Sequence, residues 1–136
     1  MLPDVDRLVT DALRSFLPGV TVMVLLPTDW QARLPLVVAS QVPGGTADYR
    51  GVARVTVDIQ ALAATRRDAS ELGRRAYSAL AEACAVRYST SEGYLGAFYD
   101  VSGLPTEVRA ASPADDPHTV FRFQGTCQVV VRPARR

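Results

Sequence analysis

The chain has 136 residues and a formal charge of +1, with 48% hydrophobic and 21% charged residues. A chain of this length fits one domain with a single hydrophobic core, and its ordinary composition excludes a disordered protein. The near-neutral charge argues against generalised binding to nucleic acid, which needs a basic surface.

The start of the chain, Met1 to Asp4, leads directly into an acidic amphipathic segment. It has neither the basic start nor the apolar run of a signal peptide. The longest apolar runs, such as Val20 to Leu26, are far shorter than the ~20 residues that cross a bilayer. These observations predict a protein that stays in the cytosol where it is made, with no membrane contact. All fifteen basic residues are Arg, which removes any lysine Schiff base from consideration.

A helix is predicted from Pro3 to Leu17, because apolar residues recur there at the spacing of one helical face. Pro18 and Gly19 end it. The next segment, Val20 to Leu26, is almost entirely apolar, which predicts a strand covered on both faces and therefore central in its sheet. The apolar face of the helix comprises Val5, Leu8, Val9, Ala12, Leu13 and Phe16.

The connection from Pro27 to Arg33 contains the only Trp of the chain, Trp30. It leads into a second apolar strand, Leu34 to Ser40, in which Pro35 indicates either an edge strand or the first residue of a strand. The Pro43–Gly45 segment predicts a turn.

The middle of the chain, Gly51 to Cys84, carries the strongest pattern, a strand followed at once by a helix. In the strand, apolar side chains alternate with polar ones, which predicts one face in the core. After a short break at Ala64–Arg67 the spacing becomes helical, with an apolar stripe opposite a charged face. Asp68 and Glu71 predict a capping box in which Asp68 is the N-cap. The apolar strand residues are Val55, Val57, Ile59 and Ala61, and the stripe comprises Ala69, Leu72, Ala76, Leu80 and Ala83.

The segment from Ala85 to Leu104 interleaves glycines with aromatic residues. This composition predicts a long loop of the kind that is functional or ordered by a partner. A short strand is expected at Glu107–Ala111 and a turn at Pro113–Pro117.

A long final strand is predicted from Thr119 to Arg132, with its apolar face on the odd-numbered residues from Phe121 to Val131. Gly125 is expected to allow a bend or bulge. The order of elements is helix, three strands, helix, loop, short strand and long strand. It predicts a single α+β domain over residues 1–136, with a mixed, mainly antiparallel sheet and two helices packed on one face.

The residues that could bind a metal or act in catalysis give only weak signals. Asp115, Asp116 and His118 are residue types that bind metals, but no second cluster completes a coordination sphere, so a solvated turn is favoured. Cys84 and Cys127 lie on apolar faces, which favours two buried thiols over a disulfide and argues against a dyad with His118.

The remaining candidates are also most simply turns. The hydroxyl run Ser89–Ser91 contains no nucleophile motif, and Gly44–Gly45 lacks the rest of a phosphate-binding loop. We therefore expect no catalytic residue, no cofactor and no metal, and a protein that is not an enzyme.

Two features favour contact with a partner. Trp30 lies in a predicted loop, where it either meets another protein or folds back onto the core. Arg66 and Arg67, with Arg74 and Arg75, form either a positive patch for a specific contact or an ordinary solvent-exposed helix face.

Taken together, several segments resemble the tail terminator proteins of long-tailed bacteriophages over nearly the whole chain. They are the helix Val5–Phe16, the strand Val20–Leu26, the strand and helix between Val52 and Ala83, and the stretches LPLVVASQVPGG and GLPTEVRAASPADDPHTVFRFQGTCQVVVR. The order of elements, the size and the long Arg-flanked final strand carry the resemblance. Related neck and minor tail proteins share much of this pattern.

The resemblance implies a structural virion protein, assembled in the host cytoplasm, that forms a homo-hexameric ring on the end of the tail tube. Such a ring stops tube polymerisation and joins the tail to the head. Its partners would be the tail tube protein on one side and a head-completion or connector protein on the other. Genomic DNA would pass through without specific binding, and a near-neutral charge suits that passage.

Exposed strand edges and an aromatic, glycine-rich loop are suitable surfaces for a neighbouring subunit. The alternatives are another neck or minor tail protein, a small cytosolic enzyme with His118 close to Cys127 or Asp100, and a monomeric binding module. The residues that we nominate for subunit or partner contacts are Trp30, Arg66, Arg67, Tyr88, Tyr94, Phe98 and Tyr99.

Overall fold

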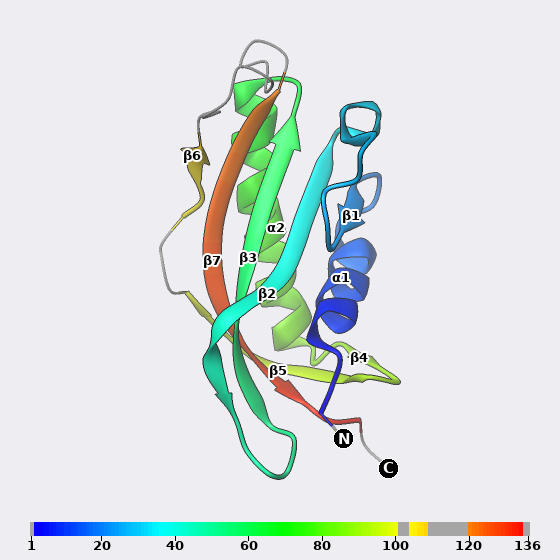
Figure 1. The fold of residues 1–136 in the computed structure, drawn as a ribbon, viewed down its shortest axis with the longest axis vertical. Coiled ribbons are helices and arrows are strands. Elements are labelled where there is room, and N and C mark those ends of the chain that lie inside the picture. Colours follow the sequence, from blue (N-terminus) through cyan, green and yellow to red (C-terminus); the bar gives the residue numbers. More distant parts are fainter. Residues whose placement is uncertain (1, 101–103, 109–119, 135–136) are drawn as a thin grey trace.

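The structure is a computed structural model that describes residues 2–100, 104–108 and 120–134. In Figure 1 the two long helices lie side by side behind one face of a single twisted sheet. This arrangement confirms the predicted α+β class. In chain order the elements are α1 (Val5–Phe16), β1 (Thr21–Met23), the 3-10 turn η1 (Trp30–Arg33), β2 (Leu36–Ala47), β3 (Ala53–Ala63), α2 (Arg66–Ala85), β4 (Ser89–Thr90), β5 (Gly93–Asp100), β6 (Thr106–Val108) and β7 (Phe121–Arg132).

Within the described residues the sheet has seven strands, in the order β1-β2-β3-β7-β5-β4, and β6 pairs with β7 beside β5. β1 and β2 run parallel, whereas the other neighbouring strands are antiparallel. The long strands β2, β3 and β7 form its centre, with β3 paired to β7 from Ala53 to Ala63 without a break. The prediction of a mixed, mainly antiparallel sheet is therefore confirmed.

Helix α1 forms where the sequence predicted it. Asp4 caps its start, because the carboxylate accepts a hydrogen bond from the Arg7 amide at 3.2 Å. The apolar stripe turns toward the sheet, and Leu8 and Leu13 are fully buried. Neither helix in the described part of the chain is long and apolar enough to cross a membrane.

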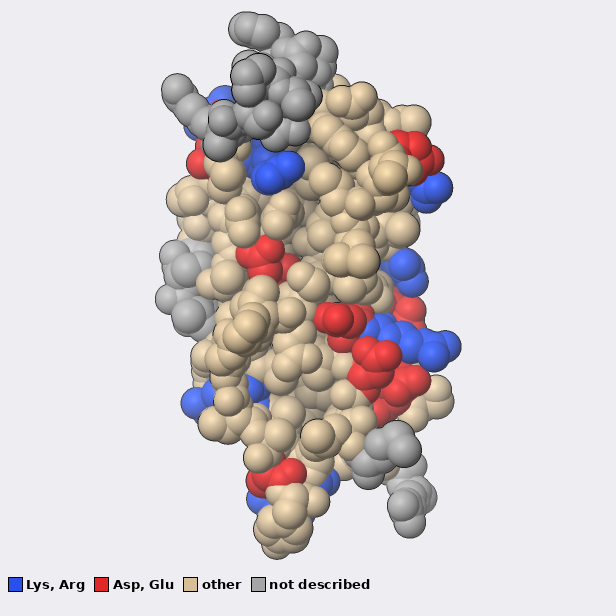
Figure 2. Space-filling view, viewed as in Figure 1, with Lys and Arg blue, Asp and Glu red and all other residues tan. Residues whose placement is uncertain are grey.

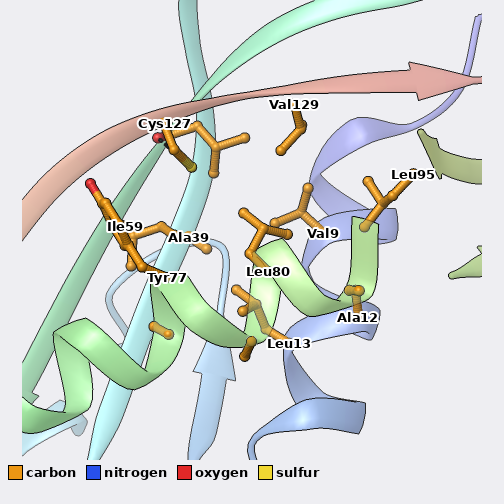
Figure 3. Packing of buried hydrophobic residues seen from close by; sticks show 14 of the residues in the cluster. Val9, Ala12, Leu13, Ala39, Ile59, Tyr77, Leu80, Leu95, Cys127 and Val129 are labelled. Atoms are coloured by element: carbon orange, nitrogen blue, oxygen red, sulfur yellow. Dashed lines mark hydrogen bonds between the residues drawn. The ribbon is translucent and has the colours of Figure 1, made fainter. Parts of the chain in front are cut away.

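The strand and helix that carry the strongest pattern, β3 and α2, form the centre of the core. Every predicted apolar residue of β3 is buried, as is every predicted residue of the α2 stripe. Figure 3 shows Leu80 of α2 between Leu13 of α1 and Val129 of β7. Each such side chain contributes about 1.5–3 kcal/mol when fully buried, so this layer stabilises most of the fold.

The predicted N-cap of α2 was wrong by three residues. The helix begins at Arg66, and Thr65 is the N-cap, whose hydroxyl accepts a hydrogen bond from the Asp68 amide at 3.1 Å. Thr65 and Asp68 stand in the three-residue spacing of a capping box, so Asp68 occupies the position that we assigned to Glu71.

The first predicted strand is shorter than expected and is not central. Only Thr21–Met23 pair with β2, and β1 forms an edge of the sheet. The chain then leaves the sheet, and Leu25 is 77% exposed. The strand covered on both faces is instead β2, whose residues Leu36–Ala39 are all buried.

The predicted turn at Pro43–Gly45 is part of β2. The register with β3 shifts between Val42 and Gly45, so these residues form an irregularity within the strand. The connection to β3 lies further on, at Asp48–Val52, where Asp48 and Val52 are joined by a backbone hydrogen bond of 3.0 Å.

The predicted loop from Ala85 to Leu104 is largely a hairpin, β4–β5. The prediction of a loop was wrong because the glycines allow strands to pair closely. A Cβ atom at Gly93 would collide with the Arg132 carbonyl oxygen of β7, and Gly96 lies where the register shifts between Leu95 and Ala97. Glycine in a strand marks such bulges and close approaches as well as loops.

Strand β7 follows its predicted pattern, but Gly125 makes no bulge. Its pairing with Ile59 of β3 is regular. A Cβ atom there would collide with the hydroxyl of Tyr77, so glycine makes room for this ring. The short strand β6 ends at Val108, and the rest of the predicted strand and the turn at Pro113–Pro117 lie outside the described residues.

Candidate assembly surfaces

The face of the sheet opposite the helices is open and mainly polar. Figures 1 and 2 look onto this face, and Figure 2 shows few charged side chains across its middle. Asp58 is 9% exposed and accepts hydrogen bonds from Gln60 Nε2 at 3.1 Å and Gln124 Nε2 at 2.8 Å. The two amides satisfy the carboxylate that this face would otherwise leave unpaired.

Trp30 packs on the open face of the sheet. It is half-buried and packs with Met23 against a small cluster of Leu36, Val38 and Leu62 on the side of the sheet away from the helices. Of the two readings of Trp30, the structure shows the ring folded onto the protein, with part of its surface still exposed.

Arg66 and Arg67 are both exposed at the start of α2. Arg66 Nε donates to Glu107 Oε2 at 2.8 Å, and its guanidinium carbon lies 5.5 Å from the centre of the Phe123 ring. Arg66 therefore joins α2 to β6, and an exposed pair of this kind contributes at most about 1 kcal/mol. Arg74 and Arg75 line a shallow groove of about 260 Å³ beside the end of α1.

The aromatic residues of the β4–β5 region divide into two groups. Tyr88 packs edge-to-face on Phe16 with ring centres 6.3 Å apart, and Phe98 packs in the same way on Tyr77 at 6.4 Å. Both rings lie against the main core. Tyr94 is half-buried.

Tyr99 lies outside that core and is 44% exposed. The guanidinium carbon of Arg54 lies 4.9 Å from its ring centre, across the intervening strand β7. The seven nominated residues do not form one patch. β4 and β5 cross the lower end of the molecule in Figure 1, whereas α2 begins at the upper end.

The feature that the sequence analysis missed is a protruding hairpin. β2 and β3 continue past the helices and form an arm, residues 41–55, at the lower end of Figure 1. Tyr49 stands at its tip and is 96% exposed. The sequence feature that indicates this hairpin is Asp48–Gly51, because Asp at the first and Gly at the fourth position favour a type I turn.

Hydrogen bonds fix the conformation of the turn at the tip of the arm. The Asp48 carboxylate accepts hydrogen bonds from the Arg50 and Val52 amides at 2.8 and 3.2 Å, and Arg50 Nη2 lies 2.9 Å from Asp48 Oδ2. Gly51 has a φ of 82°, a conformation that glycine adopts without strain. The Arg50 side chain and the two amides hold the pKa of Asp48 below its ordinary value, although desolvation opposes them.

A shallow groove of about 280 Å³ runs along the arm, from Gln41 to the residues beside the tip, Ala47 and Ala53. The N-terminal residues Leu2, Pro3 and Val5 form one side, and both strands of the arm form the other. Leu2 is 59% exposed. The arm thus carries an exposed aromatic ring at its tip and, along its length, a groove lined by both polar and apolar residues.

The edge of β2 beyond β1 is blocked against another strand. The Gln41 amide donates to Asp6 Oδ1 of α1 at 2.7 Å, and Pro43 has no amide hydrogen to offer. Charged side chains and proline are common ways to prevent strand addition at an edge. The Gln41 and Pro43 positions of this edge are therefore not available to pair with an added strand.

The residues considered for catalysis or metal binding are the two cysteines and the group around His118. Cys84 and Cys127 are buried thiols, as predicted, and desolvation raises the pKa of Cys84 to about 12. A thiol so far from ionisation is a poor nucleophile. Residues 109–119, with Asp115, Asp116 and His118, lie outside the described part. Within the described part, no three His, Cys, Asp or Glu side chains gather as metal ligands.

The family model described as phage tail termination protein matches residues 1–136. No curated protein matches the chain. The match extends over both helices, the whole sheet and the arm, and the family it identifies is structural rather than catalytic. The chain therefore belongs to the family of phage tail termination proteins.

Proposed function

We propose that six copies of this chain form a closed ring that caps the tail tube, ends its polymerisation and presents the surface to which the head docks. The observation that carries this proposal is the family match over all 136 residues. Ring closure requires two different, complementary surfaces on each copy, related by a rotation that closes. No cofactor or metal is needed for such a role.

The shape of the molecule supports assembly through side chains. One face of the sheet is anchored by helices, while the other face and the arm are available for contact. The blocked edge of β2 favours a finite assembly, because open strand edges promote unlimited stacking. The formal charge of +1 suits a ring through which DNA slides, since a strongly basic lumen would retain the phosphates.

We infer that the exposed members of the nominated set, Arg66, Arg67 and Tyr99, contact neighbouring subunits, the tail tube protein or the head-completion protein. Trp30 and Tyr94 are half-buried and offer smaller contact areas. Tyr88 and Phe98 pack on the core, so they act through the shape of the β4–β5 hairpin.

The proposal is tested with the purified chain and the tail tube protein. Native mass spectrometry should give a particle six times the 14.7 kDa mass of one chain, alone or on the tube. Electron microscopy should place this particle at tube ends, and tubes grown in its presence should stop lengthening. A chain that neither binds tube ends nor limits their growth would contradict the proposed function.

A further inference from the structure

We propose that α1 covers the outer edge of the sheet and so prevents copies of this chain from joining there by strand pairing. An edge strand presents unpaired amide and carbonyl groups to which a strand of another molecule can add. Here β1 and the part of β2 beyond it form that edge, and α1 lies against both (Figure 1). The inference goes beyond the proposed ring, because it holds for any number of copies.

Arg14, in the last turn of α1, occupies the outward carbonyl of β1. The Thr21 amide donates to the Pro35 carbonyl oxygen, on the side of β2. Because successive residues of a strand direct their backbone groups to opposite sides, the Val22 carbonyl points away from β2. Arg14 donates to this oxygen from Nη2 at 2.8 Å and from Nε at 3.2 Å. A second molecule therefore finds the outward acceptor of this short strand already in use.

Asp6, in the first turn of α1, occupies an outward group of β2. The Gln41 amide donates to Asp6 Oδ1 at 2.7 Å. Pro43, two residues further along the same side of the strand, has no amide hydrogen. Asp6 and Arg14 are eight residues apart, which is about 12 Å along a helix and the length of about four strand residues. α1 thus covers the edge over the span of a short strand.

These polar contacts protect the edge more than they stabilise the fold. The Arg14 side chain is 51% exposed and its Nη1 lies 3.5 Å from Asp11 Oδ1, so solvent screens its interactions. α1 is held instead by its apolar face, where Leu8 and Leu13 are fully buried. Removing the polar contacts should therefore leave the fold in place and expose the edge.

The first experiment follows one edge amide by hydrogen exchange and NMR. Asp6→Ala removes the acceptor of the Gln41 amide, which should then exchange at least about 10-fold faster, because the lost hydrogen bond is to a charged group. Asp6→Asn keeps an oxygen acceptor in the same place and should keep most of the protection. Unchanged exchange at Gln41 in Asp6→Ala would overturn the proposal.

The second experiment measures association between copies by mass photometry. The double variant Asp6→Ala/Arg14→Ala frees both edge groups, so particles larger than the wild-type assembly should appear at a protein concentration at least about 10-fold lower. Adding Pro43→Ala returns an amide hydrogen to the edge and should lower this concentration further. Asp29→Ala/Arg33→Ala is the matched control, since it removes an exposed pair of the same residue types from η1. A double variant that associates no more than this control would overturn the proposal.

The particles themselves distinguish pairing at the edge from association of unfolded chains. Hydrogen exchange with mass spectrometry is applied to them. If the edge pairs, the segment around Gln41 regains protection in the particles, and the central strand β3 keeps the protection that it has in the wild-type chain. Particles in which the β3 amides exchange freely would consist of unfolded chains and would overturn the proposal.

Discussion

The same two strands, β2 and β3, build both the core and the arm, and the two regions differ in what surrounds them. In the core, Leu36–Ala39 of β2 are buried on both faces. In the arm, β2 from Gln41 to Ala47 is exposed or half-buried, and the tip is fixed mainly by hydrogen bonds. One hairpin therefore carries buried core residues at one end and an exposed surface at the other.

The largest expected effect tests the core side of this comparison. Leu80→Ala should lower the free energy of unfolding by about 2–5 kcal/mol, because Leu80 is fully buried between the helices and the sheet. Urea unfolding followed by circular dichroism gives this value. Tyr49→Ala removes a larger side chain but should change it by less than about 0.5 kcal/mol, since the tip is exposed. Similar losses in both variants would show that the arm supports the fold.

A smaller effect is expected where α2 approaches β7. Gly125→Ala should lower the free energy of unfolding by about 1–3 kcal/mol, because the new methyl group would collide with the Tyr77 hydroxyl. Thermal or urea unfolding measures the loss. Adding Tyr77→Phe removes the oxygen, so the double variant should lose less than the sum of the two single variants. Simple additivity would contradict the contact.

The corrected N-cap gives a prediction of about 1 kcal/mol. Thr65→Ala should destabilise the protein by this amount, because the Asp68 amide loses its acceptor. Thr65→Ser keeps a hydroxyl and should restore most of the stability. An unchanged unfolding midpoint for Thr65→Ala would indicate that the helix begins elsewhere.

The smallest effect concerns the tip of the arm and should leave global stability unchanged. Because the folded pKa of Asp48 is lowered, its interactions are complete above the ordinary value of 3.8 and are lost only as the pH falls through the lower folded pKa. Carboxyl NMR titration should therefore give a midpoint below 3.8 for Asp48. Arg50→Ala should move the midpoint upward, and an unmoved midpoint would exclude the Arg50 side chain as the main cause.

The sequence predicts the core well, because apolar residues that recur along one side of a helix or strand indicate that this side is buried. Both helices, β3 and β7 follow from the alternation of apolar residues such as Val57 and Leu80. It predicts the edges of the sheet less well, since pairing there depends on distant residues. Gly93 looks like a loop residue until the Arg132 carbonyl lies against it. Val20–Leu26 looks central because periodicity cannot distinguish a strand from an apolar segment that leaves the sheet.

The contact surfaces are harder to predict for a different reason. Aromatic residues suggest both packing and binding, and Tyr88 and Phe98 turned out to pack on the core. Tyr49 lay in a segment whose turn was placed several residues too early, at Pro43–Gly45. The exposure of a side chain depends on where a hairpin outgrows the helices beside it, and no local pattern records that position.

The hydrogen bond from the Gln41 amide to Asp6 joins the first turn of α1 to the point where β2 leaves the core. On the outer edge of β2 a side chain of the helix thus takes the place of a neighbouring strand, while β3 and β7 hold the arm from the other side as far as Ala53.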